Sequence, residues 1–177
     1  IEELRSLPID DVFSVEDDRF GTWNGDLLVS SAAACVATTN ARFIIFSRDI
    51  GTLELAPRLA ARMSGASVVG VTNVDVAEDG TVLVEATAFG GAARANYQVT
   101  SLGPLVLGMA PRRMAAVSFP PKAYQRITTL PVPTGFVERV RIIEPASEPG
   151  SRLEDARYVV SGGRGLGEAK NFDLVRD

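Results

Sequence analysis

Histidine is absent from this chain of 177 residues, and cysteine occurs only once, at Cys35. Without histidine, no Ser-His-Asp or Cys-His catalytic arrangement and no histidine-based metal site can form. One cysteine excludes an internal disulfide and is too few for a thiolate metal site. Acid–base chemistry would have to rest on carboxylate, tyrosine or lysine side chains, and the sequence offers no convincing pair of these. We therefore predict no catalytic residues and no metal site.

Positive charge and long apolar runs are also scarce. Lys and Arg number 18 against 22 Asp and Glu, which gives a net charge of −4, and no basic cluster occurs. This balance argues against binding to nucleic acid or to an acidic membrane surface. No apolar run approaches the length of a membrane span, so we predict no direct membrane insertion.

The chain begins at Ile1, without a methionine or a visible signal peptide, and we expect the natural N-terminus to lie upstream. Arginine exceeds lysine, and alanine and glycine are abundant. This composition favours a bacterial source, and we predict a cytoplasmic protein.

Two features have both a structural and a functional interpretation. Cys35 lies among small apolar residues (SSAAACVATT), which favours an inert core thiol over a nucleophile. The acidic run Glu16, Asp17 and Asp18 could hold a metal ion, but a solvated loop is the favoured interpretation.

Strands and helices alternate in the first part of the chain. We predict a strand at 9–15, a loop at 16–25, helices at 26–39 and 49–63, and a strand at 43–47 between the helices. The strand at 43–47 (FIIFS) is continuously apolar, as expected for burial on both faces. The alternation predicts a parallel α/β sheet with right-handed crossovers.

The helix predicted at 49–63 is amphipathic. Its apolar residues at helical spacing are Leu53, Ala56, Leu59, Ala60 and Met63. Pro57 has no N–H and fits best if the helix begins near Thr52. Arg58 and Arg62 lie on the outer side, where solvation is favoured over contact with a phosphate. Gly65 is expected to end the helix.

The next part of the chain is rich in β-formers. Apolar runs at 67–77 and 81–88 flank Glu78, Asp79 and Gly80, and Asp-Gly in this position is a strong hairpin signal. Further strands are predicted at 93–99, 105–109 and 132–143. Pro131 and Pro133 favour an edge position for the last of these.

Residues 144–155 (EPASEPGSRLED) are a composition break, rich in Pro, Ser, Gly and acidic residues. An apolar strand restarts at 158–161. We therefore predict an α/β domain at 1–145, a linker at 146–155 and the beginning of a second domain at 156–177.

The segment 159–172 (VVSGGRGLGEAKNF) is the most informative for function. It predicts a strand, a glycine turn and a helix beginning near Gly167, which together present free N–H groups to an anion. Glycine at 162, 163, 165 and 167 permits close approach of the backbone to phosphate oxygens. Arg164 can bind phosphate through two hydrogen bonds.

The spacing of these glycines fits no standard nucleotide motif. Glu168 stands where a P-loop has lysine and where GxGxxG has its third glycine. On the pattern alone, a tight strand-to-helix turn with an exposed Arg164 is the favoured interpretation.

Three segments match one family in the same order along the chain. The segment 48–66 (RDIGTLELAPRLAARMSGA) is similar to a helix of the form G-x-x-L-A-P-R-L-A-A-x-L. The segment 77–99 (AEDGTVLVEATAFGGAARANYQV) is similar to the stretch before an A-G-N-A-x-A-T-V element. SGGRGL at 161–166, followed by E-x-x-NF at 168–172, resembles the start of a flavin domain. Together, from about Ile9 to Phe172, they resemble the α subunit of the electron transfer flavoproteins.

The resemblance implies a fold, a cofactor and a partner. The fold is an α/β domain with a mixed, mostly parallel sheet and a β-hairpin element, followed by the first strand-turn-helix of a doubly wound FAD domain. The cofactor is FAD, which in the family is contacted by the arginine at the position of Arg164, with Gly162, Gly163 and Gly165 close to it. The partner is the β subunit of a heterodimer.

The resemblance also implies a role as an electron carrier rather than an enzyme. Electrons would pass from flavin dehydrogenases, as in fatty acid β-oxidation, to a membrane-bound quinone oxidoreductase or a related bacterial acceptor.

The sequence also departs from the family pattern. The later FAD elements S-R-A-A-V-D and G-Q-T-G have no counterpart, and we expect the family's first strand and helix to be missing before Ile1. Gly90, Gly91 and Ala92 stand in place of A-G-N. Two other hypotheses stay open: an adenine-nucleotide-binding regulatory module without a redox role, and a scaffold at 1–145 that docks a partner subunit.

Overall fold

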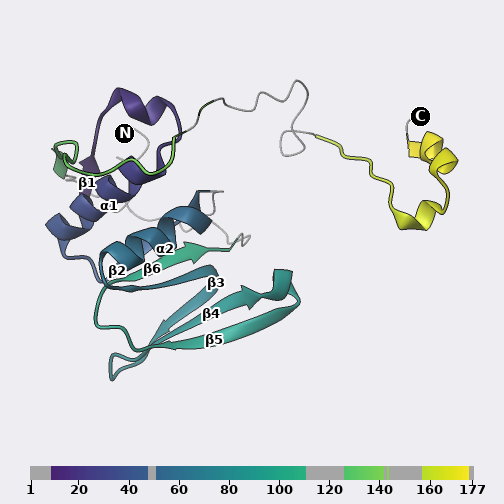
Figure 1. Ribbon diagram of the computed structural model, residues 1–177. Helices are drawn as coiled ribbons and strands as arrows, with labels where there is room; N and C mark the ends of the chain where they lie inside the picture. Colours follow the sequence, from purple (N-terminus) through teal and green to yellow (C-terminus); the bar gives the residue numbers. More distant parts are fainter. Residues whose placement is uncertain (1–8, 48–50, 111–125, 142, 144–156, 176–177) are drawn as a thin grey trace. The chain divides into compact units, whose positions relative to one another are not determined.

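The structure, a computed structural model, describes residues 9–47, 51–110, 126–141, 143 and 157–175 (Figure 1). The chain divides into two compact units, Ile1–Ile142 and Ile143–Asp177. The linker predicted at 146–155 lies outside the described residues, and the domain assignment stays a prediction. Within the described ranges, no helix is long and apolar enough to cross a membrane.

The strands of the first unit form two sheets. The larger sheet contains β2 (Phe43–Phe46), β6 (Leu105–Met109), β3 (Ala66–Val76), β4 (Val82–Ala88) and β5 (Ala93–Val99), in that order. β2, β6 and β3 are parallel, whereas β4 and β5 are added in antiparallel fashion. A separate parallel pair joins β1 (Asp11–Ser14) to β7 (Arg126–Thr129). The predicted α/β class, with a mixed and mostly parallel sheet, is confirmed.

Helix α1 (Gly25–Thr39) is defined by asparagine at both ends. The Asn24 side chain accepts a hydrogen bond of 2.9 Å from the Leu27 N–H, which satisfies one of the free donors of the first turn. Asn40 ends the helix in a left-handed conformation, with φ 49°, and its N–H donates to the Val36 carbonyl. The helix predicted at 26–39 is therefore confirmed.

Helix α2 (Thr52–Arg62) begins where Pro57 favours it, at Thr52. Pro57 nevertheless lies beyond the first turn, so the helix lacks one backbone hydrogen bond. At the other end, Ser64 is left-handed, with φ 53°, and the Gly65 N–H donates to the Ala60 carbonyl at 2.8 Å. This is the Schellman type of helix end, and Gly65 marks the stop as predicted.

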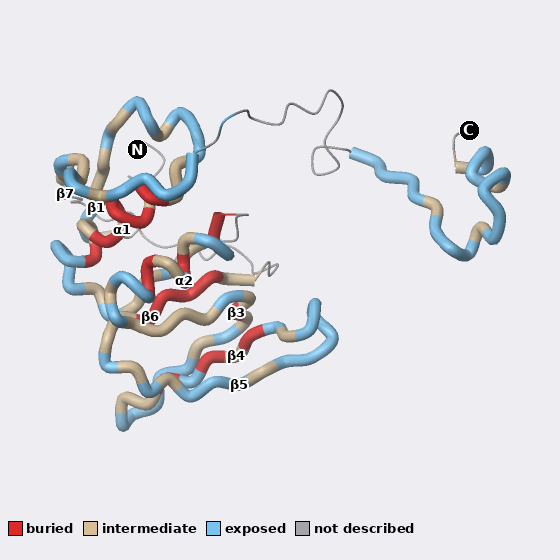
Figure 2. The backbone as a smooth tube through the Cα atoms, viewed as in Figure 1, coloured by how far each residue is buried: buried red, intermediate tan, exposed pale blue. Residues whose placement is uncertain are grey.

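The buried residues of the first unit form two hydrophobic clusters. Figure 2 shows buried positions along both helices and along the strands of the larger sheet. On one face, α2 packs against β3 and β6, and also against α1. The buried residues of this cluster are Ala33, Val36, Ala56, Leu59, Ala60 and Val106. A second cluster is formed by Val71, Val82, Val84, Leu105 and Leu107.

The predicted β3–β4 hairpin is confirmed. Val76 pairs with Val82 at its end, and the Ala77 N–H donates to the Thr81 carbonyl at 2.9 Å. Gly80 adopts φ 84°, a conformation that glycine tolerates better than other residues. The Asp79 carboxylate accepts a hydrogen bond from the Thr81 N–H at 2.8 Å. Its pKa is lowered mainly by that bond.

Three predictions about these elements were wrong. Leu53 is not part of the core face of α2, because 69% of its surface is exposed. The strand at 43–47 is not buried on both faces, because β2 is the outer strand of the larger sheet and Ile45 is 64% exposed. The described residues of 132–143 form no strand. The backbone N–H groups of Arg139 and Val140 donate to the Asp26 carboxylate instead of to a strand, and the short strand β7 precedes the two prolines.

Gly65 packs directly against backbone. A Cβ at this position would lie 2.0 Å from the Pro104 carbonyl oxygen. Replacing Gly65 with alanine should lower the free energy of unfolding by about 1–3 kcal/mol, because a backbone atom cannot rotate away from the new methyl group. Urea unfolding followed by circular dichroism measures the change. Gly21→Ala is the matched control, since a Cβ there meets nothing within 4 Å, and an equal loss in both variants would contradict the argument.

Candidate functional site

The glycine turn of the second unit carries the residues predicted to contact a cofactor. Arg164–Leu166 form a single 3-10 turn that follows Gly163. The Leu166 N–H donates to the Gly163 carbonyl at 3.0 Å, and the Gly167 N–H donates to the Arg164 carbonyl at 3.1 Å. The N–H groups that open such a turn have no acceptor within it. The turn therefore presents backbone donors beside an exposed arginine.

The turn is closed by Gly167 and Asn171. Gly167 has φ 76° and ψ −68°, and the Glu168 N–H donates across it to the Leu166 carbonyl at 2.9 Å. These angles belong to the strained form of the γ-turn, which glycine tolerates best. The Asn171 side-chain amide donates to the same Leu166 carbonyl at 2.6 Å. The asparagine of the E-x-x-NF element thus fixes the shape of the glycine turn.

The four glycines of the turn have different roles. A Cβ at Gly162 would lie 2.4 Å from Leu166 Cδ1 and 3.0 Å from Phe172 Cε1, so Gly162 is needed for packing. A Cβ at Gly163 or Gly165 would meet nothing within 4 Å. Open space beside these two residues is what close approach of a ligand to the backbone requires.

The elements around the turn differ from the prediction. Residues 158–161 do not form a strand, and Ala169–Val175 form a 3-10 helix instead of the start of an α-helix. A strand is stabilised by hydrogen bonds to a neighbouring strand, and none is present within residues 157–175. The turn is therefore formed by local hydrogen bonds alone.

A shallow hollow of about 420 Å³ lies against the turn. Its lining comes from one short segment: Gly163, Arg164, Leu166, Gly167, Glu168, Ala169 and Phe172. Glu168 forms an exposed ion pair of 2.7 Å with Lys170, so the Glu168 carboxylate is paired with Lys170 and not with Arg164. No ion pair of Arg164 is found in the described part of the chain, so its guanidinium group is available to an anion.

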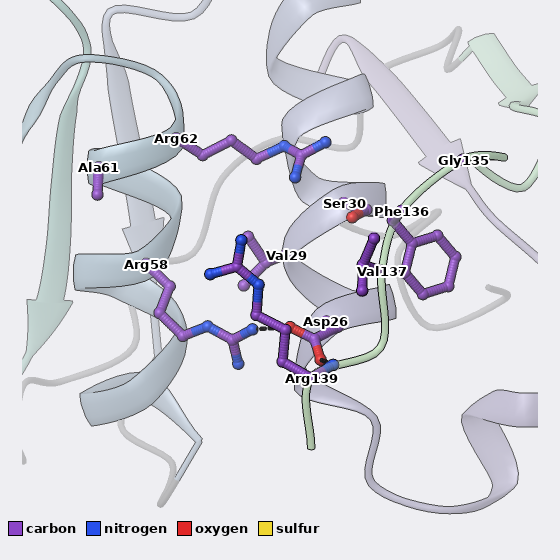
Figure 3. Close-up of a pocket in the computed structure, with 10 residues that line it drawn as sticks. All are labelled: Asp26, Val29, Ser30, Arg58, Ala61, Arg62, Gly135, Phe136, Val137 and Arg139. Carbon is purple, nitrogen blue, oxygen red and sulfur yellow. Dashed lines mark hydrogen bonds and ion pairs between the residues drawn. The ribbon is translucent and has the colours of Figure 1, made fainter. Parts of the chain in front are cut away.

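A second constellation, in the first unit, was not predicted from the sequence. The Asp26 carboxylate is 8% exposed and forms an ion pair with Arg58 of α2 (Figure 3). Arg58 also pairs with Glu54. Asp26 also accepts backbone hydrogen bonds from Arg139, at 2.6 Å, and from Val140, at 3.3 Å. It thereby joins α1, α2 and the segment that follows β7.

The environment of Asp26 favours its charged form. The Arg139 N–H is the largest influence lowering its pKa, followed by the Val140 N–H and by Arg58, while burial acts in the opposite direction. One signal was available in the sequence, namely an acidic residue in the first turn of the predicted helix 26–39. Its partners at 139–140 lie more than 110 positions away, which no local pattern reveals.

The acidic run at 16–18 and Cys35 are the remaining candidate residues. Asp17 caps a 3-10 turn and pairs with Arg19 at 2.7 Å, and this side-chain hydrogen bond is the main cause that lowers its pKa to about 2. No group of acidic, cysteine or histidine side chains with the geometry of a metal site occurs among the residues that the structure describes. Cys35 is partly buried, and burial raises the pKa of its thiol, as expected for an inert residue.

Comparison with known proteins decides the family. A family model described as "Electron transfer flavoprotein domain" matches residues 2–134, three quarters of the chain. This chain belongs to the electron transfer flavoprotein family. The resemblance found in its sequence motifs is thereby confirmed.

The relatives include both α subunits and FixB proteins. The electron transfer flavoprotein subunit alpha of Thermoanaerobacterium thermosaccharolyticum is 22% identical over 99% of this chain and 54% of its own length. Protein FixB of Azorhizobium caulinodans is 25% identical over 98% of this chain and 48% of its own length. Protein FixB of Bradyrhizobium diazoefficiens is 25% identical over 93% of this chain and 46% of its own length. The chain thus spans about half the length of the curated relatives it matches.

The family match and the glycine turn cover different parts of the chain. The matched region ends at residue 134, within the first unit, and the turn at 162–167 belongs to the second. The alignments with the α subunit and with FixB nevertheless extend over nearly the whole chain, the turn included.

Proposed function

We propose that this chain is part of an electron-carrier subunit that works through FAD. The observation that supports the proposal most strongly is the match of the electron transfer flavoprotein domain to residues 2–134. Within the complete protein, electrons would pass from flavin dehydrogenases to a quinone oxidoreductase or a related acceptor. The chain itself would act as a carrier rather than as an enzyme.

The glycine turn has the features that FAD binding would use. Arg164 would hold a negatively charged part of the cofactor, with Gly163 and Gly165 allowing the backbone to approach and Gly162 keeping the turn compact. Bound FAD would supply the redox chemistry, and these residues would bind and orient it. Because the hollow is lined from one side by a single short segment, tight binding needs further residues from the rest of the subunit.

The partner of this subunit is proposed to be a β subunit, with which it would form a heterodimer. The test is to produce the α subunit that contains this sequence together with its β subunit and to purify the complex. A flavin absorption spectrum that co-elutes with both chains is expected. A stable complex without any flavin would contradict the proposed redox role, whereas failure of the chains to associate would contradict the proposed heterodimer.

Arg164 provides the sharpest test of the flavin site. Arg164→Ala in the complete subunit should weaken FAD retention about tenfold or more, since a charge-assisted hydrogen bond contributes roughly 1.5–3 kcal/mol. Flavin release during equilibrium dialysis measures the effect. Arg157→Ala in the same unit is the control, because Arg157 stacks on Tyr158 outside the turn. Unchanged FAD affinity in Arg164→Ala would assign Arg164 to the exposed surface of a purely structural turn.

An adenine-nucleotide module without a redox role is the alternative function. The glycine turn supports it as well, since its donors suit a phosphate of any nucleotide. A thermal-shift comparison of the complete subunit with FAD, ATP and AMP separates the two. A rise in the melting temperature with ATP or AMP, and none with FAD, would favour the alternative.

A further inference from the structure

A cavity of about 520 Å³ lies in the first unit, between α1, α2 and the segment 135–139 (Figure 3). Arginine side chains reach it from both sides. Arg58 and Arg62 come from α2, and Arg139 comes from the segment that Asp26 binds. These residues are far apart in the sequence, so no sequence motif marks the site.

The charges around the cavity do not cancel. Arg58 is neutralised by Asp26 and Glu54. No ion pair is found for Arg62 or Arg139 within the part of the chain that the structure describes. Three guanidinium groups therefore face two carboxylates, which leaves an excess positive charge at the cavity. Figure 3 shows both unpaired groups extending into the space between the two helices.

The Asp26 interaction also orients Arg139. Asp26 binds the backbone N–H of Arg139, and no partner of the Arg139 guanidinium group is found among the described residues. The backbone of the segment 135–139 is thus fixed while its cationic side chain remains available. Such an arrangement reduces the conformational entropy that a ligand would otherwise have to overcome.

The rest of the lining is partly apolar. Val29 and Ser30 of α1 are buried, and the largely exposed Val137 faces them from the segment 135–139 (Figure 3). The Phe136 ring points to the other side of that segment, where it lies 5.6 Å from Arg19. The Ser30 hydroxyl forms no hydrogen bond with another described residue, so it can donate to a ligand oxygen. Arginine side chains, a serine hydroxyl and the apolar side chains of Val29 and Val137 suit a ligand with a charged head and an apolar body.

We propose that this cavity binds a small organic phosphate monoester. The phosphate would lie between Arg62 and Arg139, near Ser30, because a guanidinium group matches phosphate oxygens with paired hydrogen bonds. The apolar part of the ester would contact Val29 and Val137. The cavity lies within the size range of ordinary small-molecule sites. The site goes beyond the proposed flavin function, since it involves no residue of the glycine turn.

The test uses phenyl phosphate as the probe, with isothermal titration calorimetry on the 177-residue chain. Phenyl phosphate should bind more tightly than inorganic phosphate, because only the ester has an apolar part that contacts Val29 and Val137. Arg62→Gln and Arg139→Gln should each weaken its binding about tenfold. Arg139→Gln leaves the backbone hydrogen bond to Asp26 in place, and circular dichroism verifies that both variants are folded.

Arg94→Gln is the matched control. Arg94 is an exposed arginine of β5 that pairs with Glu85, far from the cavity lining. An equal loss of affinity in Arg94→Gln and Arg62→Gln would show a general charge effect and overturn the proposal, as would an absence of phenyl phosphate binding at millimolar concentration. Arg164→Ala should leave phenyl phosphate binding unchanged, so the outcome is independent of the flavin test.

Discussion

Replacing Leu59 with alanine should lower the free energy of unfolding by about 2–5 kcal/mol. Leu59 of α2 is fully buried against α1 and the larger sheet, in the cluster that contains Ala56, Ala60 and Val106. The substitution removes apolar contacts and leaves a cavity, because two helices and a sheet cannot all move inward to fill it. Urea unfolding monitored by circular dichroism measures the loss.

Leu53→Ala is the control on the same helix. Leu53 is 69% exposed, so its removal creates no cavity, and alanine is at least as good a helix former. The expected change is within about 0.5 kcal/mol. Similar losses for Leu53 and Leu59 would mean that α2 has a wider buried face than the structure shows, and would restore the original prediction for Leu53.

Asp26→Ala should destabilise the first unit by about 3 kcal/mol, which is near the lower end for breaking a buried ion pair because Arg58 is 32% exposed. Two effects add up. Arg58 loses one of its two carboxylate partners, and the N–H groups of Arg139 and Val140 lose their acceptor. Thermal unfolding should show a decrease in melting temperature on the order of 10 °C.

The matched control for Asp26 is Asp18→Ala. Asp18 is exposed and no hydrogen bond or ion pair is found for it within the described ranges, so its removal should cost less than about 0.5 kcal/mol. If Asp26→Ala caused an equally small loss in the free energy of unfolding, the segment 135–140 would not be held by Asp26. The proposed phosphate site would then lose its fixed wall, which makes this a second, independent check on that site.

The stability that Asp26 contributes should depend on pH in a defined direction. Its pKa is lowered in the folded state, so the stabilisation is fully present above the unfolded carboxyl pKa of about 4. It is lost as the pH falls through the lower folded pKa. The difference in unfolding free energy between the wild type and Asp26→Asn should therefore shrink as the pH falls below about 4. A difference that is constant from neutral to acidic pH would exclude an ionised Asp26 as its source.

The elements that were predicted correctly depend on local sequence. Helix α1 lies in the alanine-rich stretch 26–39, and the β3–β4 hairpin follows from the Asp79-Gly80 turn signal between two β-rich runs. These signals act between residues that are close together in the chain. They hold wherever the element is placed in the tertiary structure.

The elements that were predicted wrongly depend on neighbours that the sequence does not reveal. Residues 132–143 contain the β-branched residues of a strand, but Asp26 accepts two of their N–H groups, and no sheet edge pairs with them among the described residues. The segment 43–47 has the apolar composition of a strand buried on both faces, yet β2 pairs with a described strand on one side only, and Ile45 is exposed. Propensity describes what a segment can form, and the available partners decide what it does form.

The sequence by itself determined the α/β class, the hairpin and the family, because these rest on local periodicity and on motifs in a fixed order. It also predicted a site at Arg164 and the glycines around it, which stays a prediction, and the turn that they form is closed by local hydrogen bonds. Only the tertiary structure decided that Leu53 lies outside the buried face of α2, that Asp26 joins three segments, and that Arg62 and Arg139 share a cavity. These are contacts between residues far apart in the chain, and they exist only once the helices pack and bring charges from distant segments together.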